Sequence, residues 1–239
     1  MKIGVFDSGI GGLTILEEVR KLLPQYDYIY YGDSKNNPYG NKTEEELFSI
    51  IVEIVEFLIV KGCKLIVIGC NTATTRCRKR LIERYPDIIF VGVVPAIKVA
   101  CDYNYKNILV LATPSTISSD RVSEIVTNNK KVDQQVYLLS CDGLANAIEN
   151  KDYELVDKLL YQYCNKYMDT GIDCIVLGCT HYPLIRDNIQ NIFAEAKIID
   201  SNLGVAKEVE RQLFNHDFFS NKQKGSVKIY NSLINKISK

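Results

Sequence analysis

The sequence lacks any excess of charge of one sign. Its 239 residues carry 29 Lys and Arg against 29 Asp and Glu, so the formal net charge is zero, and no run of like charges stands out. A protein that binds duplex DNA would be expected to show a basic face that neutralises phosphates. Nucleic acid is therefore not expected as a partner.

The sequence also lacks a hydrophobic run long enough to cross a bilayer. Its most apolar stretch, residues 47–60, is short and carries Glu53 and Glu56, whereas a spanning helix needs about 20 apolar residues. Asp7 arrives too early for the apolar core of a signal peptide. We therefore expect no membrane partner and a cytoplasmic location.

Metal-ligand spacing is missing as well. Only two histidines occur, and none of the eight cysteines forms a Cys-x-x-Cys pair, so no metal site is expected. The cysteines are spread along the chain rather than crowded into a short disulfide framework, which favours a reducing compartment. They stand at positions 63, 70, 77, 101, 141, 164, 174 and 179.

The residues that are present are typical of a globular α/β protein. Hydrophobic residues make up 46% and charged residues 24%, close to the average for a folded domain. Apolar runs of strand length alternate with segments of helical spacing, and Thr43 with Glu46 has the spacing of a capping box. This alternation predicts parallel sheets covered by helices on both faces. The expected strands include 2–6, 28–31, 65–68 and 88–91, and the expected helices 11–23, 43–60 and 72–85.

The second part of the chain repeats this pattern. Residues 107–111 resemble the opening strand, and the run that ends in Gly178-Cys179 mirrors the run that ends in Gly69-Cys70. The sequence therefore predicts two pseudo-duplicated three-layer α/β/α halves with mostly parallel sheets and an active site in the cleft between them. We expect a first domain at 1–95, with a polar, helical tail at 205–239 packing back on it, and a second domain at 96–204.

Cys70 and Cys179 each follow an expected strand and a glycine. In open α/β sheets, ligands bind beyond the carboxyl ends of the strands, and a helix N-terminus at that place stabilises a thiolate. The adjoining Asn71, Thr72 and Thr180 can bind a carboxylate through hydrogen bonds. The other six cysteines are more typical of small apolar core residues.

A pair of equivalent thiols suits the inversion of a stereocentre. Such a reaction needs a base on one face of a carbon and an acid on the other face. One thiolate removes the proton, the opposite thiol returns one, and the two exchange roles in the reverse direction. No cofactor is needed for this chemistry.

Five motifs together resemble those of the glutamate racemases of the aspartate/glutamate racemase superfamily. They occur in that family's order and cover the chain from about residue 3 to residue 201. The motifs are DSGIGGL at 7–13, Gly32-Asp33 followed by PYG at 38–40, CNTAT at 70–74, ATPST at 112–116 and GCTHYP at 178–183.

The resemblance implies racemisation of glutamate independent of pyridoxal phosphate or any other cofactor. The product, D-glutamate, would supply peptidoglycan synthesis and so cell-wall biogenesis and cell shape. By the same resemblance Cys70 and Cys179 are the catalytic thiols, with Asp7 assisting the first and His181 the second. The resemblance is also compatible with a homodimer, and the sequence does not decide the oligomeric state.

The resemblance also implies which residues bind the substrate. Taken by itself, Asp7 could instead be a helix N-cap, His181 a structural histidine, and the segment 38–40 an ordinary turn. The segment 34–37 lacks an arginine that is common there in the family, and the tail after Gly225 departs from the family pattern. The implied substrate-binding residues are Asp7, Ser8, Pro38, Tyr39, Gly40, Asn71, Thr72, Thr116, Thr180 and His181.

Three other functions compete with this interpretation. An aspartate racemase or another racemase of the superfamily would use the same thiols, but aspartate racemases usually have an acidic residue in place of His181. A non-catalytic amino-acid-binding protein would also suit two α/β halves, yet it would not need paired thiols. Dinucleotide binding is disfavoured because Thr14 stands where the fingerprint requires glycine.

Overall fold

The computed structural model describes residues 1–234 and divides the chain into two compact units. Unit 1 comprises Met1–Val93 and the chain from Asn202 onward, and unit 2 comprises Val94–Ser201. The predicted limits of independently folding domains, 1–95 with 205–239 and 96–204, stay a prediction. The part of that tail at 235–239 lies outside the described residues.

Unit 1 is built on one parallel sheet with the strand order β4-β3-β1-β2-β9. Apart from the edge strand β9, its strands are largely buried, as expected where helices cover both faces. The strands are β1 (Lys2–Asp7), β2 (Asp27–Gly32), β3 (Cys63–Ile68), β4 (Ile89–Gly92) and β9 (Val227–Asn231). The helices are α1 (Gly12–Leu22), α2 (Glu44–Val60), α3 (Asn71–Arg84) and α10 (Asn202–Asn215), with 3-10 turns η1 (Ser34–Asn36) and η2 (Tyr39–Asn41).

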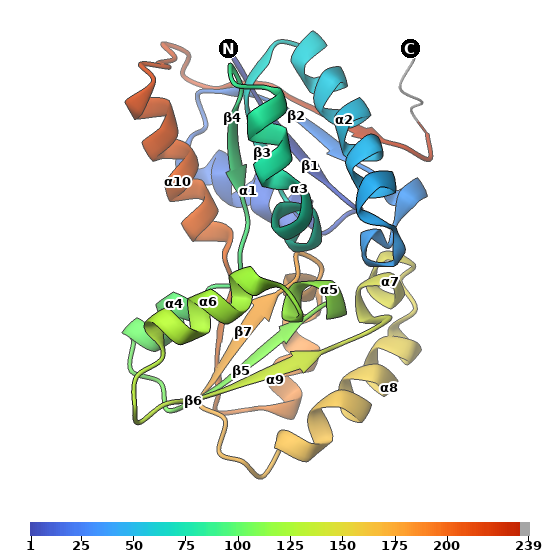
Figure 1. The fold of residues 1–239 in the computed structure, drawn as a ribbon, viewed down its shortest axis with the longest axis vertical. Helices are drawn as coiled ribbons and strands as arrows, with labels where there is room; N and C mark the ends of the chain where they lie inside the picture. The colour runs from blue at the N-terminus through green and yellow to red at the C-terminus, as the bar shows by residue number, and fades with distance from the viewer. Residues whose placement is uncertain (235–239) are drawn as a thin grey trace. The chain divides into compact units, whose positions relative to one another are not determined.

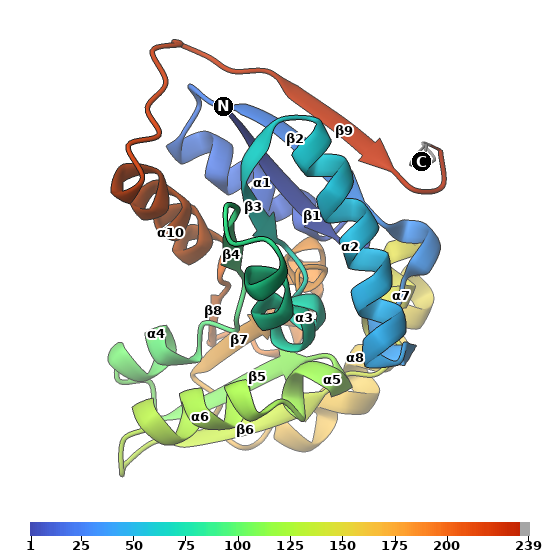
Figure 2. The ribbon, with the colours of Figure 1, turned by 45° about the horizontal axis from the view of Figure 1, so that its top comes forward.

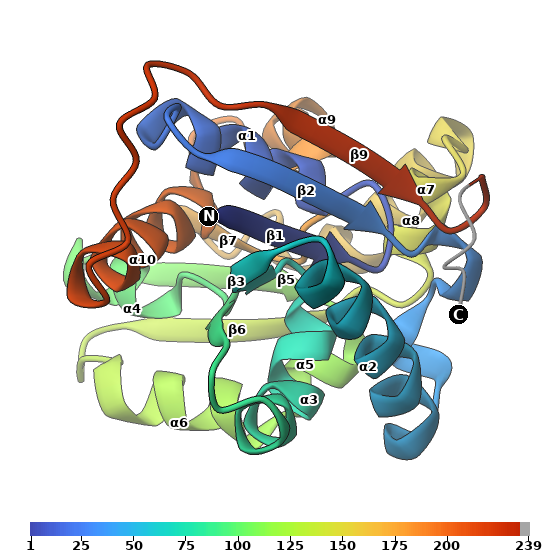
Figure 3. The ribbon, with the colours of Figure 1, turned by 90° about the horizontal axis from the view of Figure 1, so that it is seen from above.

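Alternate residues of this sheet pack into different cores. Ile3, Val5 and Val67 pack with the side chains of α1 and α10, whereas Phe6 and Ile66 pack with those of α2 and α3. Successive side chains of a strand point to opposite faces of a sheet, so each face receives its own layer of helices (Figure 3). Unit 1 is therefore a three-layer α/β/α structure.

Unit 2 is built on a parallel sheet with the order β6-β5-β7-β8. Its strands are β5 (Asn107–Ala112), β6 (Gln135–Ser140), β7 (Cys174–Gly178) and β8 (Lys197–Ile199). Its helices are α4 (Ile97–Asp102), α5 (Pro114–Ile117), α6 (Asp120–Asn129), α7 (Leu144–Glu149), α8 (Tyr153–Cys164) and α9 (Arg186–Ile192), with 3-10 turns η3 (Asn165–Tyr167) and η4 (Tyr182–Ile185).

The sheet of unit 2 is also covered on both faces. Leu109 and Leu177 belong to a core that includes residues of α7, α8 and α9, whereas Val110 and Val176 belong to one with residues of α4 and α6. Figure 1 shows these helices on either side of β5 and β7. The order β6-β5-β7-β8 repeats the order β2-β1-β3-β4 of unit 1. The predicted α/β class, with parallel sheets in two duplicated halves, is confirmed.

The expectation of a wholly helical tail is wrong. The helix α10 ends at Asn215, and Val227–Asn231 then forms β9, which pairs in parallel with β2 at the edge of the unit 1 sheet (Figure 2). The segment is short and its side chains are half-buried or exposed. An edge strand of this kind shows neither a continuous apolar run nor a clean alternation, so the sequence carries no clear strand signal.

Just before β9, the chain passes very close to the residues that precede β2. A Cβ at Gly225 would lie 1.7 Å from the carbonyl oxygen of Tyr26, so only glycine fits at this position. The Gly225 amide donates to the carbonyl of Pro24 at 2.8 Å. The carboxylate of Asp27 then accepts from the amide and the hydroxyl of Ser226, each at 2.8 Å.

The helix α2 begins with the predicted capping box. The Thr43 hydroxyl accepts from the Glu46 amide at 3.3 Å, and the Glu46 carboxylate accepts from the Thr43 amide at 2.9 Å. Such reciprocal bonds satisfy amides that a helix start otherwise leaves open. Although α2 is rich in apolar residues, no helix within residues 1–234 has the length and apolarity needed to cross a membrane.

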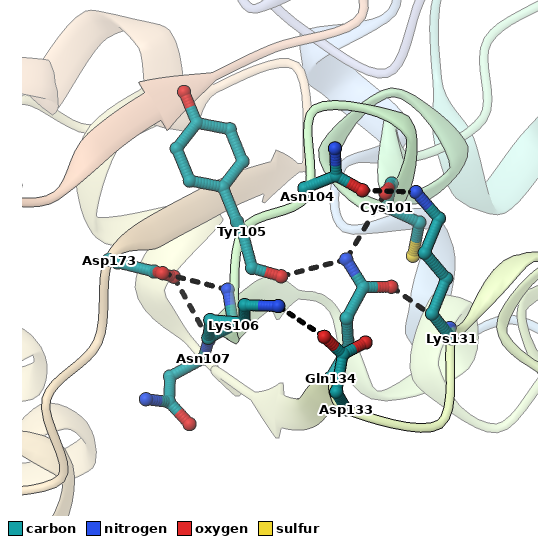
Figure 4. Close-up of polar contacts among 9 residues, drawn as sticks. All are labelled: Cys101, Asn104, Tyr105, Lys106, Asn107, Lys131, Asp133, Gln134 and Asp173. Atoms are coloured by element: carbon teal, nitrogen blue, oxygen red, sulfur yellow. Dashed lines mark hydrogen bonds and ion pairs between the residues drawn. The ribbon is translucent and has the colours of Figure 1, made fainter.

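A buried glutamine closes the amino end of the sheet in unit 2. The Gln134 side chain is fully buried. Its amide nitrogen donates to the carbonyls of Cys101 at 3.1 Å and Tyr105 at 2.7 Å, and its oxygen accepts from the Lys131 amide at 2.9 Å (Figure 4). One side chain therefore joins the end of α4, the start of β5 and the turn before β6.

Replacing this glutamine is expected to destabilise the protein. Gln134→Ala leaves two buried carbonyls and one amide without their partner and should lower the free energy of unfolding by about 1–3 kcal/mol. The neighbouring Gln135 is exposed, so Gln135→Ala should change it by less than about 0.5 kcal/mol. Urea unfolding of both variants measures the difference, and equal midpoints would contradict this role.

Candidate active site

The unit 1 candidates gather at the carboxyl edge of its sheet. Asp7 ends β1, and Cys70 follows β3, which is the parallel neighbour of β1. The amide of Gly69 donates to the carbonyl of Phe6 at 2.7 Å, so the two strand ends are joined directly before the two functional side chains. Parallel pairing thus brings a carboxylate and a thiol to one edge.

Asp7 is fully buried and lies against the start of α1. Its Oδ2 accepts from the amides of Gly9 at 3.2 Å and Gly12 at 3.0 Å. A Cβ at Gly12 would lie 2.6 Å from the Asp7 Cβ, so only glycine lets the helix begin this close. The alternative interpretation of Asp7 as a helix N-cap is wrong, because Gly11 occupies that position; Asp7, at the end of β1, instead accepts from the first helical amide.

Cys70 occupies the N-cap position of α3 and is 7% exposed. Its carbonyl accepts from the Thr74 amide at 2.9 Å, while the amides of the first helical turn point back toward this end. Asn71 and Thr72 are buried in that turn. The Oδ1 of Asn71 is buried and has no hydrogen-bond partner among residues 1–234, which leaves an acceptor beside the thiol.

Tyr39 lies in the loop that follows β2. Its hydroxyl donates to Oδ2 of Asp33 at 2.9 Å. Burial raises the pKa of Tyr39 well above its usual value, and the charges of Asp33, Cys70 and Asp7 raise it further. The phenol therefore lies in the same electrostatic environment as the candidate thiol and carboxylate.

The remaining unit 1 candidates differ in exposure. Ser8 is buried directly after Asp7, and Pro38 is half-buried beside Tyr39. Gly40 is exposed. Asp33 is almost completely buried, and burial raises its pKa, whereas hydrogen bonds from Asn36, Ser232 and Tyr39 oppose that rise.

In unit 2, Cys179 follows β7, the counterpart of β3, and is also 7% exposed. Its Sγ lies 3.9 Å from Nδ1 of His181. The chain next forms the 3-10 turn η4, and α9 begins only at Arg186. The expected helix entry directly after Cys179 is therefore a 3-10 turn, a common lead-in to an α-helix.

Glu149 completes this group, and the sequence analysis missed it. Its Oε2 lies 2.7 Å from Nε2 of His181, and both side chains are almost fully buried. A carboxylate that accepts from Nε2–H leaves the Nδ1 lone pair of a neutral imidazole facing the thiol. Glu149 ends α7 with no motif around it, and its contact with His181, 32 residues away, is what identifies it, which a sequence alone does not reveal.

The two threonines of unit 2 are buried. Thr116 lies on α5, which follows β5, and its hydroxyl is 3.0 Å from that of Thr113. Thr180 directly follows Cys179 and is 5% exposed. Since β5 and β7 are parallel neighbours, both threonines belong to the loops at the carboxyl edge of this sheet.

The six cysteines expected to be core residues are all buried. Burial raises the pKa of each of these thiols. It reaches about 11 for Cys77 and about 12 for Cys63, Cys164 and Cys174. The pKa values of Cys101 and Cys141 are also raised, mainly by burial. They are therefore neutral packing groups at ordinary pH.

Comparison with known proteins identifies the family. Residues 14–209 match the family model for Asp/Glu/Hydantoin racemase. The chain is 42% identical over 239 residues to a glutamate racemase from Clostridium perfringens, covering 98% of this chain and 92% of the relative.

Solved structures agree with this match. A glutamate racemase isoform from Bacillus anthracis superposes with a TM-score of 0.84 at 30% identity, covering 97% of this chain and 88% of that one. The glutamate racemase from Francisella tularensis in complex with D-glutamate gives a TM-score of 0.83 at 31% identity, covering 99% and 89%. The chain therefore belongs to the Asp/Glu/Hydantoin racemase family, and within it to the glutamate racemases.

Proposed function

We propose that the protein interconverts L- and D-glutamate, with Cys70 and Cys179 as the two acid–base groups and no cofactor. The observation that carries the proposal is the equivalence of these thiols. Each lies just after the corresponding strand of a repeated strand order, Cys70 after β3 and one further residue, and Cys179 immediately after β7. The substrate is inferred from the glutamate racemases that the chain resembles, one of which was solved with D-glutamate.

The reaction moves one proton off a carbon and another onto it. One sulfur, as thiolate, takes the Cα proton of glutamate and becomes a thiol, which leaves the electron pair on a planar carbon. The other sulfur, as thiol, gives its proton to the opposite face of that carbon and becomes a thiolate. The proposal thus requires both sulfurs to reach one Cα in the substrate-bound protein. By resemblance, Cys70 acts on D-glutamate and Cys179 on L-glutamate.

Buried polar groups beside each thiol are suited to hold the substrate. The unpartnered Oδ1 of Asn71 can accept from the ammonium, and the carboxylate of Asp7 adds negative charge nearby. Hydroxyl groups and backbone amides can donate to the two substrate carboxylates. The groups proposed to bind the substrate are those of Asp7, Ser8, Pro38, Tyr39, Gly40, Asn71, Thr72, Thr116, Thr180 and His181.

Different groups assist proton transfer at the two thiols. His181 faces Cys179 with Nδ1, and the Glu149 carboxylate orients the imidazole from the other side. The imidazole can accept the thiol proton and return it. In unit 1 the carboxylate of Asp7 has the corresponding role for Cys70, and it is fixed by backbone amides rather than by an imidazole.

The product fits a biosynthetic role in the cell wall. The two enantiomers of glutamate have equal free energies, so the equilibrium constant is one and the reaction alone yields only a mixture. A reaction that consumes D-glutamate must draw it onward, and peptidoglycan synthesis is such a consumer. We place the reaction in the reducing cytoplasm, where thiols persist.

Removing either thiol is expected to abolish racemisation. Cys70→Ala and Cys179→Ala should each lower kcat/KM by at least about 10³-fold. The loss should be equal in both directions, because the equilibrium constant fixes the ratio of the two kcat/KM values. Circular dichroism of glutamate solutions measures both rates.

Buried cysteines on the same elements provide the controls. Cys77→Ala on α3 and Cys174→Ala on β7 should keep kcat/KM within about threefold of the wild type. A Cys70 or Cys179 variant with a near-normal rate would remove the basis of the two-thiol mechanism.

Solvent deuterium should enter the product. In D₂O the sulfur that donates carries a deuteron, so each newly formed enantiomer should carry deuterium at Cα from the first turnover. Mass spectrometry of the separated enantiomers detects it. Product that keeps the original hydrogen would show that one group transfers the same proton across the carbon.

Glu149→Gln is expected to slow the reaction without unfolding the protein. The amide can donate to Nε2 of His181 and thereby favour the tautomer with hydrogen on Nδ1, which faces the thiol as a donor. We expect kcat/KM to fall about tenfold or more in both directions. The matched control is Glu154→Gln at an exposed position of α8. Equal rates in the two variants would exclude a role for Glu149.

A further inference from the structure

Three arginines on α3 attach this helix to three different neighbours. Arg76 donates from Nη2 to the Lys42 carbonyl at 2.9 Å and from Nη1 to the Tyr39 carbonyl at 3.4 Å. Arg78 donates to the carbonyl of Phe90 in β4 at 3.2 Å from Nη2. Arg80 forms a two-pronged ion pair with Glu45 of α2, both contacts being 2.8 Å. Of these three, Arg76 contacts the loop that follows β2.

The loop held by Arg76 is poorly fixed by packing at its tip. Gly40 and Asn41 are exposed, and a Cβ at Gly40 would meet nothing within 4 Å. Tyr39 anchors one side of the loop through its buried ring and its bond to Asp33. Arg76 donates to the carbonyl of Tyr39, which begins the turn η2, and to that of Lys42, which follows it. The Tyr39 carbonyl also accepts from the Lys42 amide at 3.3 Å.

The same helix carries Cys70 at its start. Tyr39, Cys70, Ala73 and Cys77 belong to one buried cluster, so the loop and the first turns of α3 pack together. Thr72 and Arg76 are four residues apart and therefore lie on one face of the helix. A side chain on this face can set the distance between the loop and the candidate thiol.

We propose that Arg76 is a positioning residue, which holds the Tyr39–Lys42 loop in place relative to Cys70 for glutamate binding. This inference rests on the proposed function, in which Tyr39 and Gly40 contact the substrate. Arg76 itself touches backbone carbonyls and not the reacting atoms. The segment 34–37 has no arginine of its own. The guanidinium that binds the Tyr39–Lys42 loop comes instead from Arg76 on α3.

The chemistry of the side chain explains why arginine stands here. A planar guanidinium presents several donors in a fixed fork and can bind two carbonyls at once, whereas an ammonium on a flexible stem acts as a point charge. Among residues 1–234 no carboxylate forms an ion pair with Arg76. Removing it therefore does not leave a buried acid without its counter-charge.

Kinetics of Arg76→Met test the proposal. The variant loses both loop contacts, so KM for L- and D-glutamate should rise about tenfold, while kcat stays within about threefold. Arg76→Lys keeps the charge but has a single donor nitrogen in place of the guanidinium fork, so it should recover part of the affinity. The matched control is Arg78→Met, which removes an exposed arginine that donates to a backbone carbonyl from the same helix and should leave KM unchanged.

Hydrogen exchange provides a readout that does not depend on activity. Amide exchange at residues 39–42 should be faster in Arg76→Met than in the wild type, and unchanged in Arg78→Met. If Arg76→Met does not fold, Arg76→Lys is measured in the same way. Faster exchange together with a raised KM supports the proposal.

Two results would overturn it. Exchange at 39–42 that is no faster in the Arg76 variants than in Arg78→Met would show that the loop does not depend on Arg76. A fall in kcat at unchanged KM would place Arg76 in the chemistry instead of in positioning. The two proposals can fail separately. If the wild type does not racemise glutamate, but amide exchange at 39–42 is faster only in the Arg76 variants, the proposed function is wrong and the role of Arg76 in holding the loop is supported.

Discussion

The parallel pairing of β1 with β3 and of β5 with β7 is the constraint on which the candidate site depends. Parallel strands deliver all their carboxyl ends to one edge of a sheet, where the chain must leave the core and expose polar groups. In unit 1 this places Asp7 and Cys70 on adjoining strand ends. In unit 2 it places the loops with Thr116 and Cys179 on adjoining strand ends. Because the strand order is the same in both units, each sulfur takes the same position in its own sheet.

Much of this arrangement could be predicted from the sequence because the signals are local. Continuous apolar runs predicted β1, β3, β5 and β7, and the residues after them predicted the two thiols. The capping box at Thr43 predicted the start of α2.

The features that escaped prediction depend on contacts between distant segments. Glu149 is identified only by its contact with His181, 32 residues away, and Arg76 by carbonyls 34 and 37 residues away. The strand β9 forms by pairing with β2, which would otherwise be the edge strand of the sheet. The side chains of β9 show no clear alternation of buried and exposed residues.

Burial separates the cysteines into two kinds. The six core thiols lie inside the helix–sheet layers, where burial raises their pKa because a thiolate there would lose its hydration. Cys70 and Cys179 are nearly as buried, and each has a polar side chain within two residues along the chain, Asn71 and His181. Cys70 stands at a helix start next to Asn71, and Cys179 faces an imidazole held by a carboxylate. Cys141 also follows a strand, β6, so a strand end alone does not mark a candidate catalytic thiol. What Cys70 and Cys179 share is the equivalent place in two sheets of the same strand order.

The polar groups near the two thiols differ in kind, although the sheets that carry the thiols have the same strand order. A reaction between enantiomers demands only that the two values of kcat/KM be equal, since the equilibrium constant is one. It places no such demand on kcat or KM taken separately. Backbone amides hold the Asp7 carboxylate at the end of β1, whereas the Cys179 thiol faces an imidazole that is paired with Glu149. An imidazole changes charge near neutral pH more readily than a carboxylate does. Under the proposed mechanism, the two halves of a duplicated fold can therefore differ in how each thiol is activated and still catalyse one symmetric equilibrium.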